Sequence, residues 1–162
     1  RYQASNSMDY FGATSRKFRF QFTLVGALSD RTIRAGFHNT FSVADAADGA
    51  YFEIVSGVAS VKTAENGVRT TDATTYAMAL DTAYTLDIDI PAGGGSKRFR
   101  IYAGTSTTAV LDVTITDTRL TDGTRRTNVG IVATMAGTTA SDILILHSLG
   151  VGTVEGFTRV MG

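Results

Sequence analysis

The chain has 162 residues, no cysteine, one proline and a formal net charge of zero. This length suits one domain with a sizeable core, and the absence of cysteine excludes disulfide bonds, thiolate metal sites and a cysteine nucleophile. We expect neither nucleic acid nor a membrane as a partner, because the balanced charge gives no bulk attraction to either and no apolar run approaches the roughly 20 residues of a membrane span.

The first strong strand signal in chain order lies at residues 17–25, KFRFQFTLV. Phe18, Phe20 and Phe22 alternate there with polar residues. A side-chain period of two with one apolar face is typical of a half-buried antiparallel strand. The polar residues 1–16 that precede it lack such a period, and we expect an N-terminal arm or a first edge strand.

Several shorter segments follow, and turn signals separate them. The predicted strands are residues 31–37, 50–56, 59–64 and 68–71. Residues 65–67 contain Asn-Gly, a pair that hairpin turns favour because both positions adopt a positive φ. Residues 38–49 read as a longer polar loop, and residues 74–81 fit either a single helical turn or a strand.

Residues 83–116 form three alternating runs, which we place at the centre of the fold. Their apolar faces carry Leu86 and Ile88, then Phe99 and Ile101, then Leu111 and Val113. Turn-forming connections at 91–96 and 104–108 separate the runs. This pattern predicts a three-stranded antiparallel meander.

Two more strands, at residues 128–135 and 142–149, precede a Gly-rich tail at 151–162. Residues 143–146 are apolar on both faces, which predicts a strand covered on both sides. Roughly nine to eleven short strands without a convincing helix predict an all-β fold, a two-sheet antiparallel β-sandwich over residues 17–150. The predicted core consists of Phe18, Phe20, Phe22, Leu86, Ile88, Ile101, Leu111, Val113, Ile131 and Ile145.

Six segments give this order of strands its character: the Phe-rich 18–24, RAGF at 34–37, DGAYFEI at 48–54, YTLDIDI at 84–90, RFRIY at 98–102 and ASDILIL at 140–146. The order resembles the concanavalin A-like lectin/glucanase jelly roll, as found in laminin-G-like modules. It also resembles the variants of that fold in bacteriophage tail, fibre and capsid-decorating proteins, which are likewise rich in Thr, Gly and Ala. The resemblance covers residues 16–150 and implies a jelly-roll sandwich.

Asp87 and Asp89 are paired carboxylates on one strand face. In the glucanases that this chain resembles, carboxylates at alternate strand positions perform acid/base and nucleophilic work. The glutamates that flank an aspartate in those enzymes are missing here. The alternative is a solvated face on which the two aspartates pair with Arg98 or Arg100 across strands. We favour that alternative and expect no catalytic residues and no enzyme activity.

The loop at 38–49 contains Asn39, Asp45 and Asp48, whose oxygens suggest a calcium site. Laminin-G-like modules carry calcium at the sandwich rim, and the resemblance therefore implies the same possibility. The spacing matches no EF-hand, and the same residue types serve ordinary turns. No other cofactor is expected. His38 and His147 lack further ligands for a metal site, so we expect a satisfied core histidine or a surface one.

A glycan site combines an aromatic platform with hydrogen-bonding side chains. The candidate ligand-binding residues are Tyr51, Tyr76, Tyr102, Asp87 and Asp89. The chain has no tryptophan, which weakens this hypothesis. The basic residues within 97–100 and 119–126 are expected to form solvated faces or part of a subunit contact, because nearby carboxylates balance them.

The function predicted from these features is that of a non-enzymatic structural domain of a bacteriophage virion, in capsid decoration or a tail appendage. Its location would be the extracellular particle, and it would serve assembly, stabilisation or adhesion to a host surface. Predicted partners are other virion proteins, a cell-surface glycan and further copies of the chain, because apolar residues in the tails need a neighbour to bury them. The resemblance to phage appendage proteins implies that the homo-oligomer is a trimer. The alternatives are a lectin-like carbohydrate-binding module and, more remotely, a glycoside hydrolase.

Overall fold

The computed structural model describes residues 2–9, 14–40, 44–120, 126–136, 144–153 and 156–160, and their side chains within 14–40, 44–120, 127–136 and 145–150. In these ranges the regular elements are 13 strands. No helix of the described ranges is long and apolar enough to pass through a membrane.

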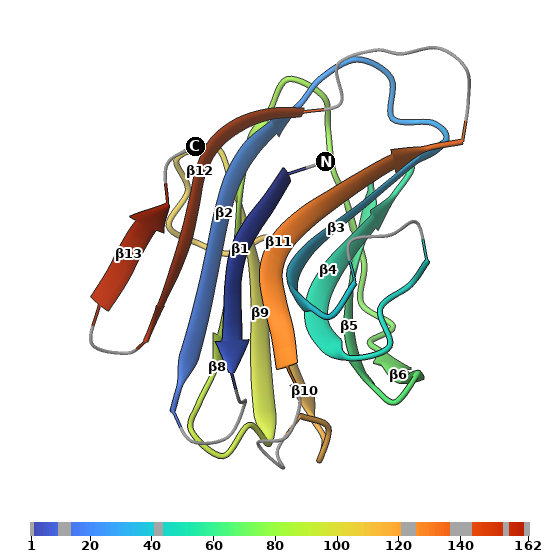
Figure 1. Cartoon of the computed structure of the whole chain (residues 1–162). Helices are drawn as coiled ribbons and strands as arrows, with labels where there is room; N and C mark the ends of the chain where they lie inside the picture. The colour runs from blue at the N-terminus through green and yellow to red at the C-terminus, as the bar shows by residue number, and fades with distance from the viewer. Residues whose placement is uncertain are drawn as a thin grey trace.

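The strands form two antiparallel sheets, as predicted (Figure 1). Their bounds are β1 Tyr2–Asp9, β2 Arg16–Leu24, β3 Arg31–His38, β4 Gly49–Val55, β5 Val58–Glu65, β6 Val68–Thr71, β7 Tyr76–Ala77, β8 Ala83–Ile90, β9 Ser96–Ala103, β10 Leu111–Thr116, β11 Arg126–Met135, β12 Leu144–Thr153 and β13 Gly156–Val160. The seven-stranded sheet has the order β1-β11-β3-β4-β5-β6, with β7 beside β5, and the six-stranded sheet has the order β10-β9-β8-β2-β12-β13.

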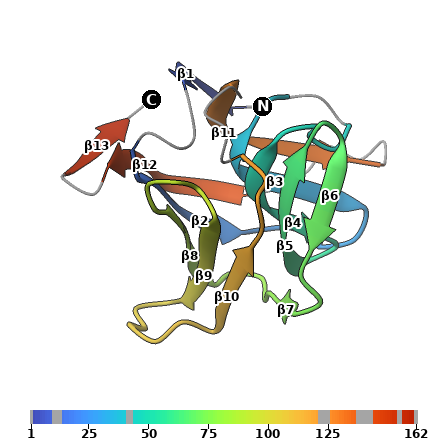
Figure 2. The same cartoon turned by 90° about the horizontal axis from the view of Figure 1, so that it is seen from below.

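The predicted meander is present as β8, β9 and β10, but it does not occupy the centre of its sheet. Strand β10 is an edge strand, and the Phe-rich strand β2 lies between β8 and β12. In Figure 2 the hairpins of β8 to β10 lie opposite those of β4 to β6. The sheets also include residues on either side of 17–150, since β1 is an edge strand and β12 continues to Thr153 before β13.

The predicted turn at residues 65–67 is confirmed by its backbone. Asn66 and Gly67 have φ angles of 51° and 78°, the positive values that a two-residue hairpin of this kind requires. Ser56 and Gly57 repeat the arrangement between β4 and β5, with φ angles of 48° and 81°. These two hairpins place β4, β5 and β6 next to one another, so their outward side chains meet.

The hydrophobic core lies between the sheets, and every predicted core residue except Ile145 is buried there. Ile145 is 53% exposed, and that prediction is wrong. It pairs with Thr23, which points outward because its neighbours Phe22 and Leu24 belong to the core. Leu146 is also exposed, so β12 is not covered on both sides.

Lys97 is fully buried, which corrects its assignment to a solvated basic face. It shares one side of β9 with the core residues Phe99 and Ile101, as the strand period requires. Its Nζ lies 2.7 Å from Oδ1 of Asp117, and the Thr63 hydroxyl of β5 donates to Oδ2 of the same carboxylate at 2.6 Å. The interior therefore contains a polar bridge between the two sheets.

Candidate functional site

The outward face of the seven-stranded sheet gathers a group of charged side chains. Because Ile33, Ala35 and Phe52 point into the core, the residues between them on β3 and β4 point outward. The register places Arg34 opposite Glu53 and Tyr51 opposite Lys62, which brings their side chains within reach of one another. These four residues join Asp45 from the β3–β4 connection and one residue of β6 in what we name the Asp45 cluster: Arg34, Asp45, Tyr51, Glu53, Lys62 and Arg69.

The Asp45 carboxylate is the centre of this cluster. Its Oδ1 accepts a hydrogen bond from the Tyr51 hydroxyl at 2.5 Å and lies 3.3 Å from Nε of Arg34. Its Oδ2 lies 3.1 Å from both Nζ of Lys62 and Nε of Arg69. Burial alone would raise the pKa of Asp45, but the hydrogen bonds from Tyr51 and Lys62 and the nearby cations lower it below its ordinary value.

Glu53 supplies the second carboxylate. Its Oε2 accepts from Nε of Arg34 at 2.8 Å, and its Oε1 lies 2.6 Å from Nζ of Lys62. The cluster thus joins three cations to two carboxylates, and one positive charge is in excess (3 − 2 = 1). Exposure differs among the members: the exposed fraction is 25% for the Asp45 side chain and 33% for that of Arg69, against 11% for Glu53, and Tyr51 is fully buried.

The other two predicted calcium ligands, Asn39 and Asp48, bind each other near the two ends of the loop that carries Asp45. Nδ2 of Asn39 donates to Oδ2 of Asp48 at 2.9 Å, and the amide of Asp48 donates back to Oδ1 of Asn39 at 3.2 Å. Asp45 instead contacts the cations of the sheet. Asn39 and Asp48 thus bind each other while Asp45 binds cations, so the structure does not bring the three side chains together as one group of ligands. The described side chains include no group of three or more His, Asp or Glu that is arranged for a metal.

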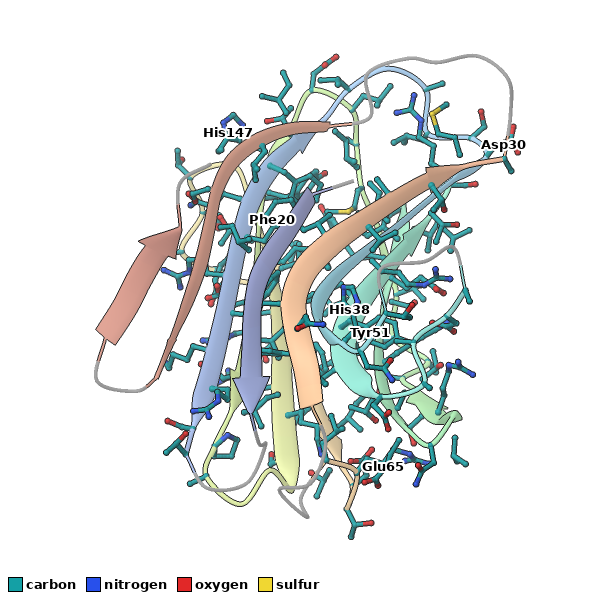
Figure 3. The ribbon with its side chains drawn as sticks, viewed as in Figure 1. Phe20, Asp30, His38, Tyr51, Glu65 and His147 are labelled. Atoms are coloured by element: carbon teal, nitrogen blue, oxygen red, sulfur yellow. The ribbon has the colours of Figure 1, made fainter. Side chains whose placement is uncertain are left out.

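The two histidines lie on different sheets (Figure 3). His38 is buried, with Nδ1 2.5 Å from the Thr40 carbonyl oxygen and Nε2 3.2 Å from that of Gly130. Its ring makes an edge contact with Tyr51, with the ring centroids 6.2 Å apart. Burial lowers the pKa of His38 and raises that of Tyr51. His147 is exposed and lies 2.8 Å from the Thr23 hydroxyl.

Asp87 and Asp89 lie on the outward face of the six-stranded sheet, where cross-strand cations neutralise them. Arg19 binds both oxygens of Asp87, at 2.7 and 2.6 Å. Asp89 contacts Lys17 at 3.1 Å and pairs with Arg100. The pair of Asp89 with Arg100 agrees with the interpretation of an outer face with cross-strand ion pairs. Arg98 takes a different partner, Asp112, through two hydrogen bonds of 2.8 and 2.6 Å.

The three candidate tyrosines are separated. Tyr102 is partly buried on the same face as Asp87, opposite Thr85 in the register. Tyr76 packs edge-on against Tyr84, with ring centroids 6.2 Å apart, and borders the core. Only Tyr51 belongs to the Asp45 cluster, so the structure does not bring the five predicted ligand-binding residues together.

Sequence reasoning missed four members of the cluster: Arg34, Glu53, Lys62 and Arg69. A signal for three of them was present. Arg34, Glu53 and Lys62 each interrupt an apolar run in one of three predicted strands that follow one another in the chain. Strands that follow one another in the chain usually pair as neighbours, so outward charges on them meet.

Comparison with protein families matches residues 1–146 to the SO2946-like C-terminal domain. No curated protein sequence matches the chain. Among solved structures, SO2946 from Shewanella oneidensis MR-1, a protein of unknown function, superposes with a TM-score of 0.64 and 16% identity. The match covers 86% of this chain and 58% of SO2946, so the chain spans little more than half the length of that relative.

Two other similar structures have carbohydrate-related names. The galectin LEC-6 from Caenorhabditis elegans has a TM-score of 0.54 and 15% identity, covering 94% of this chain and 91% of the galectin. The family 7 alginate lyase A1-II', in complex with its product GGG, has a TM-score of 0.61 and 13% identity, covering 90% of this chain and 65% of the lyase. At such identities these likenesses establish the concanavalin A-like jelly-roll fold alone. The family match over most of the sequence shows that the chain belongs to the SO2946-like C-terminal domain family.

Proposed function

We propose that this domain is a lectin-like module that binds a carbohydrate without cleaving it, at the Asp45 cluster. The observation that carries the proposal is the cluster itself, which sets guanidinium, ammonium, carboxylate and phenol groups on one face of adjoining strands. Such groups hydrogen-bond sugar hydroxyls from fixed positions. Lectins and polysaccharide-degrading enzymes among the structural neighbours share this fold, which supports the proposal.

The proposal excludes catalysis by the aspartate pair that the sequence offered. A glycosidase of this type needs two carboxyl groups that act on one bond, one of them as an acid. Asp87 is held by Arg19 through two hydrogen bonds, and Asp89 is held by Lys17 and Arg100. Cations so placed occupy the carboxylate oxygens, which suits a stabilising cross-strand ion pair rather than contact with a substrate.

A glycan array with the wild-type protein displayed multivalently tests this proposal. Retention of a subset of glycans is expected, and Arg69→Ala should weaken it about tenfold, because it removes a charged hydrogen-bond donor from the cluster. Arg98→Ala is the matched control, since it removes an exposed arginine of the other sheet. An array that retains no glycan, or binding that Arg69→Ala leaves unchanged, contradicts the proposal.

The virion role, the homotrimer and the particle location stay predictions. The family match and the similar structures named above carry no phage-related description. A carbohydrate-binding domain on a virion would unite the two hypotheses, because a cell-surface glycan is one kind of receptor for adhesion to a host. Light scattering of the purified domain tests the trimer, which is wrong for the isolated domain if a species of 17.2 kDa persists at all concentrations.

A further inference from the structure

The Asp45 cluster resembles an anion-binding site in which the Asp45 carboxylate is the bound anion. We infer that this side chain occupies the position that the carboxylate of an acidic glycan takes when the glycan binds. The external ligand would be a uronate-containing oligosaccharide that displaces the Asp45 side chain. This inference rests on the proposed function and adds two points to it: the class of sugar, and the Asp45 side chain as an intramolecular competitor for the site.

The hydrogen-bond donors of the cluster lie on strands, whereas the accepting carboxylate of Asp45 lies on a loop, and this arrangement supports the inference. The groups that contact Asp45 come from neighbouring strands: Arg34 from β3, Tyr51 from β4, Lys62 from β5 and Arg69 from β6. Asp45 itself comes from the connection between β3 and β4. Strand pairing therefore fixes the backbone positions from which these donors extend, whether or not the carboxylate is present.

The charge of the cluster favours replacement of Asp45 by another anion. Without Asp45, Glu53 is the one carboxylate of the cluster that remains beside Arg34, Lys62 and Arg69, so the cluster carries two positive charges in excess (3 − 1 = 2). A neutral sugar would leave that excess uncompensated. A uronate would restore the balance, and its carboxylate matches an arginine side chain in shape as well as charge.

The exposed side of the cluster gives a ligand access to the carboxylate. Asp45 and Arg69 are its more exposed members, whereas Arg34 and Glu53 lie deeper. Arg69 also donates to the backbone carbonyls of Asp45 and Ala46, at 3.1 and 2.9 Å. A uronate that approaches from this side meets Arg69 first and then competes for Lys62, while the Tyr51 hydroxyl lies deeper because Tyr51 is fully buried.

The test is the affinity of Asp45→Asn for a guluronate trisaccharide, measured by calorimetry beside a neutral glucose trisaccharide. Asp45→Asn keeps an acceptor for the Tyr51 hydroxyl and removes the charge. Its affinity for the acidic trisaccharide should exceed that of the wild type about tenfold or more, because charge-assisted hydrogen bonds become available, while affinity for the neutral sugar should not rise. Asp112→Asn, with the same charge change on the opposite sheet, should gain nothing.

A measurement on the wild type keeps the inference testable if Asp45→Asn does not fold. Millimolar guluronate trisaccharide should shift the amide resonances of Asp45 and Ala46 together with those of Tyr51 and Lys62. Shifts in the strands without shifts at Asp45, or an Asp45→Asn protein with no gain, overturn the inference while leaving the proposed function in place. If neither protein binds any glycan, the proposed function fails as well.

Discussion

Gly36 has a backbone conformation that any other amino acid would adopt only with strain. Its φ is +145°, and a Cβ at this position would lie 2.6 Å from the carbonyl oxygen of Ala50 and 2.8 Å from Cα of Tyr51. Both contacts are with backbone of the neighbouring strand β4, which cannot move without breaking its pairing. Gly36 therefore allows β3 and β4 to approach beneath the Asp45 cluster.

We predict that Gly36→Ala lowers the free energy of unfolding by about 2 to 4 kcal/mol, from backbone strain and crowding combined. Gly67→Ala is the matched control, because Gly67 also has a positive φ but its Cβ would meet nothing within 4 Å. It should cost only about 1 kcal/mol from strain. Urea denaturation of both variants checks the difference, and equal losses would show that crowding at Gly36 is not the cause.

His38 gives the fold a pH dependence whose sign follows from its burial. Burial lowers its pKa from the ordinary 6.5, and the adjacent Arg34 lowers it further, against the hydrogen bonds to Thr40 and Gly130. The folded protein therefore prefers the neutral ring. Its contribution to stability is present above pH 6.5 and is lost as the pH falls toward the lower, folded-state pKa.

We accordingly predict that the free energy of unfolding falls between pH 7.5 and 5.5 in the wild type, and falls less in His38→Gln, which cannot take up the proton. Urea denaturation at several pH values across that window measures both slopes. Parallel slopes for the two proteins would mean that His38 is not the titrating group. His147→Gln, a change at the exposed histidine, is the control and should leave the wild-type slope unchanged.

At the scale of elements, strand β12 shows where the sequence pattern is sufficient and where it is not. The strands with a clean period of two, such as β2 and β10, were predicted together with their buried faces. In β12 a register shift between Leu146 and Ser148 inserts one extra residue, His147. Leu149 then faces the core opposite Phe20. A bulge changes which alternate residues are buried, and composition gives no sign of it.

Because Ile145 is exposed and Ile88 is buried, substitutions of these two isoleucines should have very different effects on stability. Ile145→Thr should change the free energy of unfolding by less than about 0.5 kcal/mol, because surface substitutions away from special features are usually within that range. Ile88→Ala should lower it by about 2 to 5 kcal/mol, the range for large-to-small changes in a core. Chemical denaturation tests both predictions. A comparable loss of stability in Ile145→Thr would show that Ile145 belongs to the core.

At the scale of the whole molecule, the candidate site depends on pairings that sequence alone left open. Asp45 was identified as a chemically interesting residue, but as a calcium ligand beside Asn39 and Asp48. Its actual partners are cations from β3, β5 and β6. The strands themselves could be predicted from their period, whereas the register that brings Arg34 beside Glu53 is set by turn geometry and packing together.

The polar bridge through Lys97 connects the two sheets in the same way and carries the last prediction. Lys97 of β9 reaches Asp117, which also accepts hydrogen bonds from Thr63 of β5 and from Arg119. Burial would raise the pKa of Asp117, but these donors lower it. The carboxylate therefore has three partners, whereas the Lys97 ammonium contacts Asp117 alone among the partners that the described residues provide.

That asymmetry predicts unequal costs for removing either end of the pair. Asp117→Ala should lower the free energy of unfolding by about 3 to 5 kcal/mol, because it leaves a buried charge without its counter-ion. Lys97→Met should cost much less, since Thr63 and Arg119 still satisfy Asp117 and an apolar side chain suits the neighbours Phe99 and Ile101. In the double variant the cost of Asp117→Ala should shrink, because no buried ammonium remains. A double-mutant cycle by urea denaturation measures this coupling, and additive losses would show that Lys97 and Asp117 do not act as a pair.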